Sequence, residues 1–262
     1  MAGVLDGKRS LVCGSSQGIG RACAVELARL GSAVTVVARD ETALRKVVAD
    51  LATVGGSDHH YIIADFVDPQ SLQARVSAHV EDVGAIHILV NNTGGPPHGA
   101  LVEARPDQFL QAMSNHIVCN QLLVQTLLPG MKAAGYGRIV NIISTSVVAP
   151  IKGLGVSNTT RGAVANWGRT LAGELAPFGI TVNNILPGYT ATARLRSLFQ
   201  AKAENAGTSV EEIERRTVES IPMGRLASPE EIAAVVGFLA SPGASYLTGV
   251  NLPVDGGRTA VQ

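Results

Sequence analysis

Short runs rich in β-branched residues alternate with longer amphipathic segments along the whole chain, and this alternation is the strongest constraint on its fold. The expected strands are residues 10–13, 33–38, 60–63, 86–91, 138–143, 180–186 and 250–254. The expected helices cover residues 19–30, 41–54, 69–83, 107–132, 162–175 and 229–240. Strands and helices in this order predict a parallel sheet with helices on both faces.

Right-handed crossovers between the strands would make this a doubly wound (Rossmann) α/β fold with seven parallel strands. No repeat, low-complexity block or linker divides residues 1–262, so we expect one domain. Residues 190–218 are charged, mostly helical and placed between the last two strands. Ligands of open α/β sheets bind at the carboxyl ends of the strands, so this insertion is predicted to form a substrate lid. A solvated pair of surface helices is the alternative.

Charge and cysteine usage exclude several classes of function. Lys plus Arg and Asp plus Glu number 21 each, which leaves no electrostatic reason to expect nucleic acid or an anionic membrane as partner. No stretch approaches the ~18 apolar residues of a membrane span, and the first residues lack a secretion signal, so we expect a cytoplasmic protein. Cys13, Cys23 and Cys119 are widely spaced, which favours small buried side chains over a disulfide frame or a metal site.

A glycine-rich loop follows the first expected strand and begins a helix in "CGSSQGIGRACAVELA". Gly14 can make the tight turn, Gly18 allows the backbone to approach a pyrophosphate, and Gly20 permits close packing of helix on strand. The free N–H groups at the start of the helix and the helix dipole would bind phosphate. The strand–turn–helix context makes this triplet a credible dinucleotide site.

The GxxxGxG spacing resembles that of the short-chain dehydrogenase/reductase family, whose TGxxxGxG motif has Thr where this chain has Cys13. The stretch "NNTG" (91–94) resembles the family's NNAG. Asn115 stands where the family has a helix-interrupting catalytic Asn, and Ser144, after "GRIVNII", stands at its catalytic Ser. "LPGYTAT" (186–192) matches PGxxxT, which contacts the nicotinamide end. The likeness covers nearly the whole chain and is nearest to β-ketoacyl-acyl-carrier-protein reductase-like members.

The resemblance implies a dinucleotide-binding and catalytic domain, a small-molecule substrate and a homotetramer. It also implies, position by position, which residues contact the cofactor. They are Gly14, Ser16, Gln17, Gly18, Ile19, Gly20, Arg39, Asp65, Phe66, Asn91, Thr93, Gly94, Arg161, Pro187, Gly188, Thr190 and Thr192.

The end of the second expected strand favours NADP(H) over NAD(H). Sites that prefer NAD usually carry an acid there to bond both ribose hydroxyls, and this chain has Ala38. Arg39 follows, and its guanidinium can pair with a 2′-phosphate and stack on adenine. An ordinary surface cation is the alternative. Asp65 resembles the residue that accepts the adenine amino group, although it can also act as a helix cap.

The family's YxxxK motif reads SNTTR in this chain, because Ser157 stands at the catalytic Tyr and Arg161 at the catalytic Lys. On a helix the two side chains share one face. Arg161 can still hydrogen-bond the nicotinamide ribose, but a guanidinium does not deprotonate and cannot relay a proton. Ser157 is a poor acid. The stretch can also be a simple capped helix start, since Ser and Asn are good N-caps.

Three side chains are candidates to replace the lost acid. His98 lies in the loop after the fourth strand, near the expected substrate mouth, and Tyr189 adjoins the nicotinamide motif, where an aromatic wall is the plainer assignment. His116 follows Asn115 but is expected to pack away from the pocket. A substrate such as an iminium or an alkene protonated by water needs no protein acid.

These observations lead to two hypotheses. The first is an NADP(H)-dependent reductase of atypical mechanism that acts on a carbonyl-like, imine-like or enoyl compound, with Asn115, Ser144, Ser157 and Arg161 at its catalytic positions. The second is a catalytically weak nicotinamide-binding sensor or a partner subunit of an active paralogue.

Overall fold

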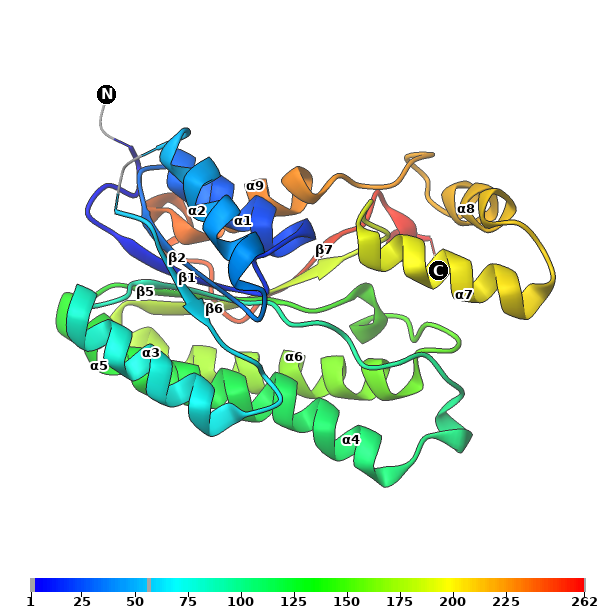
Figure 1. Ribbon diagram of the computed structural model, residues 1–262, viewed down its shortest axis with the longest axis horizontal. Helices are drawn as coiled ribbons and strands as arrows, with labels where there is room; N and C mark the ends of the chain where they lie inside the picture. Colours follow the sequence, from blue (N-terminus) through cyan, green and yellow to red (C-terminus); the bar gives the residue numbers. More distant parts are fainter. Residues whose placement is uncertain (1–2, 56–57, 262) are drawn as a thin grey trace.

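The computed structural model describes residues 3–55 and 58–261 and contains a seven-stranded parallel sheet with the strand order β3-β2-β1-β4-β5-β6-β7 (Figure 1). The order reverses between β1 and β4, as in a doubly wound fold, which confirms the predicted architecture. The strands are β1 (Arg9–Cys13), β2 (Ala33–Ala38), β3 (His60–Ile63), β4 (Ile88–Asn91), β5 (Gly137–Ile142), β6 (Ile180–Pro187) and β7 (Asn251–Val254).

Helices cover both faces of the sheet, with α1, α2 and α9 on one face and α3, α5 and α6 on the other (Figure 1). The helices are α1 (Gly18–Arg29), α2 (Glu41–Ala52), α3 (Pro69–Val83), α4 (Pro106–Met113), α5 (Cys119–Ala134), α6 (Gly155–Leu175), α7 (Ala193–Ala206), α8 (Val210–Glu219) and α9 (Pro229–Ala240). Among the helices within the described ranges, none is long and apolar enough to cross a membrane.

Two hydrophobic clusters form the core, one on each side of the sheet. Val36 of β2 belongs to the cluster under α1, α2 and α9, and Leu89 of β4 belongs to the cluster under α3, α5 and α6. Central strands such as β4 are buried at every position, which explains why they read as continuous apolar runs in the sequence. Cys13, Cys23 and Cys119 are free and buried, as expected.

A ladder of asparagine side chains crosses the sheet from β4 to β7. Asn91 Nδ2 donates to Asn141 Oδ1 (2.9 Å), Asn141 Nδ2 donates to Asn184 Oδ1 (2.8 Å), and Asn184 Nδ2 donates to Asn251 Oδ1 (2.8 Å). Helix α6 lies directly over this ladder at Gly168, where a Cβ atom would stand 2.7 Å from Asn184 Oδ1. The small residue therefore sets how closely α6, with Ser157 and Arg161, approaches the sheet.

The stretch 107–132, expected as one helix, is divided by a π-helical turn at Ser114–Val118 between α4 and α5. Asn115 lies in this turn, at the interruption that the resemblance implies. A π turn contains one more residue than an α turn, so the side chains that follow it are rotated about the helix axis relative to an unbroken helix.

Residues 190–218 form the two helices α7 and α8, which project beyond the end of the sheet (Figure 1). Arg194 of α7 donates from Nη2 to the carbonyl oxygens of Gly95 (3.3 Å) and Pro96 (3.0 Å). The insertion is therefore attached to the loop after β4, at the carboxyl end of the sheet.

Candidate active site

The glycine loop after β1 needs glycine at three positions, either for its backbone angles or because a Cβ would clash. Gly14 and Gly18 have positive φ angles of 60° and 56°. A Cβ at Gly14 would stand 2.4 Å from Asn92 O, and a Cβ at Gly20 would stand 2.2 Å from Gly14 O. Gln17 precedes α1 without a side-chain cap, so the first N–H groups of the helix stay open to a ligand. This loop fits a pyrophosphate.

Asn92 holds the glycine loop and was missed in the sequence, where its neighbour Asn91 is predicted instead. Asn92 Nδ2 lies 3.2 Å from both Cys13 O and Gly14 O. Asn91 is buried and its side chain donates to Asn141 in the asparagine ladder, so any contact of Asn91 with a cofactor would have to come from its main chain. Successive side chains of a strand face opposite sides of the sheet, and the residue after the strand is the one that reaches the loop.

Arg39 and Asp65 lie together at the ends of β2 and β3, with a distance of 3.8 Å between Arg39 Nη1 and Asp65 Oδ2. The Arg39 side chain is 76% exposed. Asp65 is not the cap of α3; Asp68 is, since its side chain accepts from Ser71 N (3.0 Å). Asp65 accepts from Val67 N instead and remains available at the expected adenine end.

His116 lies against the loop after β4, which corrects the expectation that it packs away from the pocket. His116 Nδ1 is 2.5 Å from Thr93 Oγ1, and the ring is buried. Burial, and then the positive charge of Arg161, lower the pKa of His116 to about 3. A neutral imidazole there orients Thr93, at a predicted cofactor position, and is a poor proton donor. Gly94 faces open space, with no atom within 4 Å of a Cβ built on it.

Asn115 and Ser144 occupy the predicted catalytic positions at the π turn and after β5. Asn115 Oδ1 accepts from Gln111 Nε2 (2.7 Å), and in the opposite amide orientation Asn115 donates to the carbonyl oxygen of Phe66 (2.8 Å). Phe66 thus presents its main chain to Asn115. Ser144 Oγ accepts from Ser146 N (3.0 Å), so its hydroxyl proton stays free to donate.

The side chains of Ser157 and Arg161 lie one turn apart in α6. The helix begins earlier than expected, at Gly155 after Leu154, so Ser157 does not cap it. Asn158 does not cap it either, because its Nδ2 donates to Ile151 O (2.9 Å). The interpretation of this stretch as a capped helix start is therefore wrong, and the half-buried Ser157 stays free for another role.

Arg161 is buried at the carboxyl ends of β4 and β5, with a relative exposure of 8%. Its Nη1 donates to Ile142 O (3.0 Å) and its Nη2 to Thr93 O (3.4 Å). Burial, and then the charge of Arg194, lower the pKa of Arg161 to about 10. The guanidinium thus stays protonated at neutral pH.

The predicted nicotinamide motif connects β6 to α7. Pro187 ends β6, Thr190 Oγ1 donates to Gly188 O (3.3 Å), and the Thr192 side chain caps α7 by accepting from Leu195 N (3.2 Å). The Thr192 methyl group would touch a Cβ on Gly18 at 3.4 Å. The motif therefore faces the glycine loop across the expected cofactor position.

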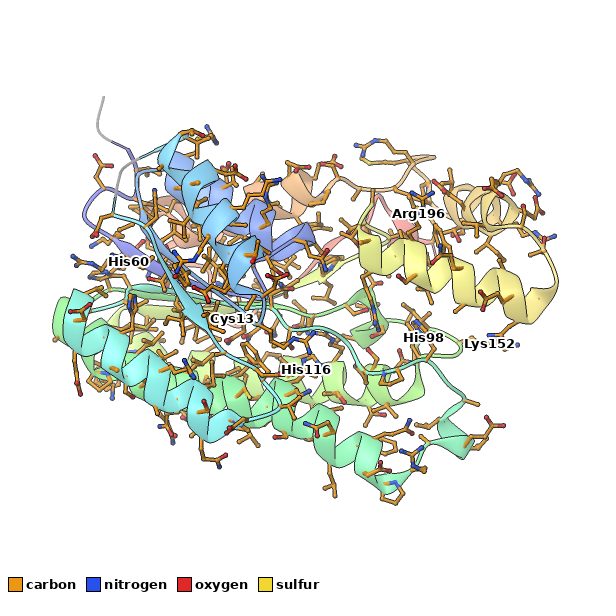
Figure 2. The ribbon with its side chains drawn as sticks, in the orientation of Figure 1. Cys13, His60, His98, His116, Lys152 and Arg196 are labelled. Atoms are coloured by element: carbon orange, nitrogen blue, oxygen red, sulfur yellow. The ribbon has the colours of Figure 1, made fainter. Side chains whose placement is uncertain are left out.

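The remaining acid candidates lie on the side of the site that faces α7. His98 lines a small pocket of about 150 Å³ that includes Val156, next to Ser157. Figure 2 shows His98 toward the end of the molecule that carries α7, with His116 nearer its middle. Partial burial, and then the charges of Arg194 and Lys202, lower the pKa of His98, so it is neutral at pH 7. The ring of Tyr189 packs 6.4 Å from Phe199, between centroids.

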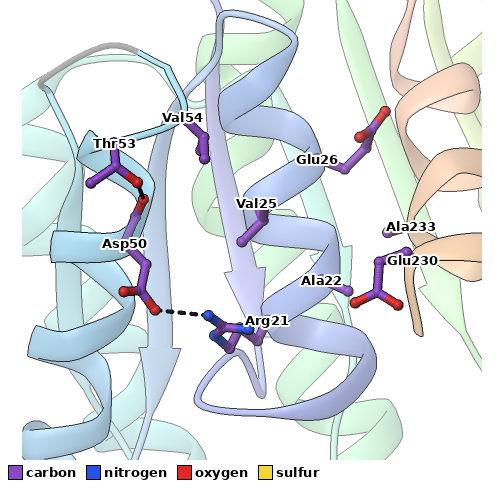
Figure 3. Close-up of a pocket in the computed structure, with 9 residues that line it drawn as sticks. All are labelled: Arg21, Ala22, Val25, Glu26, Asp50, Thr53, Val54, Glu230 and Ala233. Atoms are coloured by element: carbon purple, nitrogen blue, oxygen red, sulfur yellow. Dashed lines mark hydrogen bonds and ion pairs between the residues drawn. The ribbon is translucent and has the colours of Figure 1, made fainter. Parts of the chain in front are cut away.

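A larger hollow of about 310 Å³ lies between α1, α2 and α9, away from these residues (Figure 3). Arg21 and Asp50 form an ion pair at 2.8 Å on its wall, next to Glu230. It contains none of the predicted site residues, so we place the chemistry at the strand ends. Within residues 3–55 and 58–261, no three His, Cys, Asp or Glu side chains gather as a metal site requires.

Comparison with known proteins agrees with this geometry. The profile of a family described as enoyl-(acyl carrier protein) reductase matches residues 14–259. The 3-oxoacyl-[acyl-carrier-protein] reductase FabG of Pseudomonas aeruginosa is 35% identical over 97% of this chain and 98% of its own length. The short-chain reductase protein NovJ of Streptomyces niveus is 37% identical over 95% of this chain and 93% of its own.

Solved structures are similar to this chain over nearly its whole length. L-sorbose reductase from Gluconobacter frateurii, complexed with NADPH and L-sorbose, matches with a TM-score of 0.92 and 30% identity over 99% of both chains. YwfH, an NADPH-dependent reductase involved in bacilysin biosynthesis, matches with a TM-score of 0.90 and 28% identity over 96% of this chain and 98% of its own. The family profile and these full-length relatives confirm the resemblance read from the motifs, and the chain belongs to the short-chain dehydrogenase/reductase family.

Proposed function

We propose that this protein is an NADP(H)-dependent reductase of a small or medium-sized carbonyl-like, imine-like or enoyl substrate, with an atypical active site. The observation that carries the proposal is the intact cofactor cradle: the glycine loop held by Asn92, with Thr192 facing Gly18. The relatives support it, because those named above are reductases and two of the similar structures are described with NADPH.

The residues at the adenine end fit NADP(H) better than NAD(H). Ala38 offers no carboxylate to the ribose, and the exposed Arg39 guanidinium can move from Asp65 to a 2′-phosphate. Asp65 would then accept from the adenine amino group. Bound NADPH would supply a hydride to the substrate, and this chain would bind and orient both reactants.

Proton delivery is where this site departs from its family. With a neutral carbonyl, imine or enoyl acceptor, hydride addition leaves an electron pair on the substrate's oxygen, nitrogen or carbon, and a proton must follow; an iminium acceptor needs none. Ser144 and Ser157 can donate hydrogen bonds to that atom, and the buried charge of Arg161 stabilises the developing negative charge. Arg161 releases no proton at neutral pH, so water supplies the one that completes the product.

The missing acid makes the reductase slower without excluding it. General acid catalysis contributes roughly 10²–10⁴ in rate, or about 3–5 kcal/mol. Positioning of the reactants can contribute about 7–11 kcal/mol, and the residues that would position them are present. The alternative, a catalytically weak sensor or a partner subunit of an active paralogue, is favoured by the absence of both Tyr and Lys.

The α7–α8 insertion is proposed to act as the substrate lid, since Arg194 joins it to the loop after β4. A cytoplasmic homotetramer is proposed from the family resemblance. Exposed apolar side chains occur in two regions of the sequence, near the junction of α4 and α5 and around the end of α9, and we propose these as the two dimer interfaces. Leu110, Met113 and Val118 form the first region, and Phe238, Tyr246 and Leu247 form the second.

NADPH consumption against a panel of ketones, quinones, imines and enoyl thioesters tests the proposal, with cofactor binding measured in parallel. We expect turnover of at least one class, together with tighter binding of NADPH than of NADH. Gly14→Val is the negative control, because its Cβ would stand 2.4 Å from Asn92 O and close the cradle. Cofactor binding without turnover of any class would favour the sensor or partner-subunit alternative.

A further inference from the structure

Four cationic side chains gather where α6, α7 and the C-terminal segment meet at the site, and we call Arg161, Arg194, Lys202 and Arg258 the cation cluster. A Cβ on Gly95 would stand 3.4 Å from Arg194 Nη2 and 3.8 Å from Arg161 Nη2, so both guanidinium groups reach one point. Lys202 Nζ and Arg258 Cζ lie 6.0 Å and 5.0 Å from the centroid of the Tyr189 ring.

Direct ion pairs with the cluster are absent from the part of the chain that the structure describes. Within residues 3–55 and 58–261, no carboxylate lies within ion-pair distance of any of its four members. Arg215 and Arg225 show the contrast, because both pair with glutamates outside the site. Asp255 is near enough to Arg258 to feel its charge, yet its oxygens accept hydrogen bonds from Gly257 and Thr259.

Arg161 is the member of the cluster whose charge is most penalised by burial. It is buried, and among the described residues its guanidinium donates only to the carbonyl oxygens of Ile142 and Thr93. Arg194 repels it, and burial penalises its charge, so a second charge of opposite sign would relieve both effects. Arg194 likewise meets only carbonyl oxygens in the described chain, at Gly95 and Pro96. A guanidinium is well suited to bind a carboxylate through two parallel hydrogen bonds.

We propose that the substrate is a small organic carboxylate whose carboxylate group binds between Arg161 and Arg194, beside the carbon that accepts the hydride. This inference rests on the proposed function and narrows its substrate class. Arg161 occupies the position of the catalytic amine, so an anion bound there is only a few bonds from the reacting carbon. The phosphate of a carrier-bound thioester is separated from its carbonyl by a long arm and does not fit this place.

The test is a binding comparison between a carboxylate and its neutral analogue. 2-Oxohexanoate and methyl 2-oxohexanoate are titrated calorimetrically into the protein, both alone and saturated with NADPH, with acetoacetyl-CoA as a third probe. We expect 2-oxohexanoate to bind at least tenfold more tightly than its ester. Arg194→Gln should remove most of that preference, so that the acid and the ester bind with similar affinity.

Arg196→Gln is the matched control, because Arg196 is an exposed arginine on the same helix (Figure 2) and the change in charge is identical. It should leave the carboxylate preference intact. Equal affinity for acid and ester, or binding of acetoacetyl-CoA alone, would overturn the proposal. So would a variant Arg194→Gln that loses only affinity for NADPH, since Arg194 would then serve the cofactor. If NADPH fails to bind while the carboxylate preference remains, the proposed reductase is wrong and the anion site stands.

Discussion

Arg161 and Arg194 donate to the same four-residue segment, with Arg161 Nη2 3.4 Å from Thr93 O and Arg194 Nη2 3.0 Å from Pro96 O. Arg161 belongs to α6 and Arg194 to α7, so the loop after β4 connects α6 to the α7–α8 insertion. Movement of α7 would therefore change the charge around Arg161 as well as access to the site. This arrangement gives the insertion a part in both binding and electrostatics.

Arg39→Ala should weaken NADPH binding selectively. A charge-assisted pair contributes about 1.5–3 kcal/mol, and the exposure of Arg39 places it near the lower value, roughly tenfold in Kd. Affinity for NADH should change little, because NADH lacks the 2′-phosphate. Fluorescence titration of both cofactors measures this, with Arg75→Ala on α3 as control. Equal affinity of the unmodified protein for the two cofactors would contradict the assignment.

The double substitution Ser157→Tyr with Arg161→Lys should restore a proton donor and its amine on one face of α6. Ketone reduction should then rise by an amount approaching ~10²–10⁴. Arg161→Lys alone should do little, since no suitable hydroxyl would be present. Thr159→Tyr with Arg161→Lys is the matched control, because Thr159 is exposed on another face of the helix. Unchanged turnover in a folded, NADPH-binding double variant would mean that the site serves other chemistry.

His116 should make the protein sensitive to acid. Its pKa falls from about 6.5 to about 3 on folding, chiefly through burial, so the unfolded chain binds its proton first as the pH falls. The stabilisation from a neutral His116 is complete above pH ~6.5 and is lost as the pH falls toward 3. At pH 5 the loss is about 2 kcal/mol.

The measurement is the free energy of unfolding by urea at pH 7 and pH 5. His116→Gln should reduce the difference between the two values, although it also removes the bond to Thr93 and lowers stability at pH 7. An identical pH dependence in His116→Gln and the unmodified protein would rule out this role of His116.

Gly168→Ala and Gly173→Ala should have opposite effects, although both lie in α6. A Cβ at Gly168 would stand 2.7 Å from Asn184 Oδ1 and 2.8 Å from Asn141 Nδ2, whereas nothing lies within 4 Å of one at Gly173. The first should cost about 1–3 kcal/mol through overpacking, and the second should gain up to ~1 kcal/mol in helix propensity. Thermal unfolding distinguishes them. If both substitutions stabilised the protein, the asparagine ladder would have moved to accommodate the Cβ at position 168, and the prediction for Gly168 would be wrong.

Light scattering should give the mass of a tetramer. Phe238→Glu and Leu110→Glu place charges on the two separate exposed apolar regions, so each should leave a dimer held by the other interface. A monomeric mass for the unmodified protein at micromolar concentration would contradict the assembly.

The order of strands and helices follows from the sequence because hydrophobic periodicity and the Gly14-Gly18-Gly20 spacing are local properties. The strands at 33–38 and 60–63 and the helices at 69–83 and 229–240 agree with their predicted bounds. Asn115 was placed at a helix interruption by resemblance, and the structure has its π turn there. The replacement of the family's Tyr and Lys by Ser157 and Arg161 is implied by the resemblance and stays a prediction.

Contacts between distant segments are what only the tertiary structure decided. The pairing of β4 with β5 places the Asn91 side chain against Asn141. Asn92, the next residue, then holds the glycine loop through its bond to Cys13 O. His116, inside the π turn, meets Thr93 of the loop after β4, which lies 23 positions earlier in the sequence. The meeting of Arg161 with Arg194 depends on how α7 packs, across 33 positions of the sequence. Periodicity carries no information on such pairs, because a charge acts through space on whatever the fold brings near it.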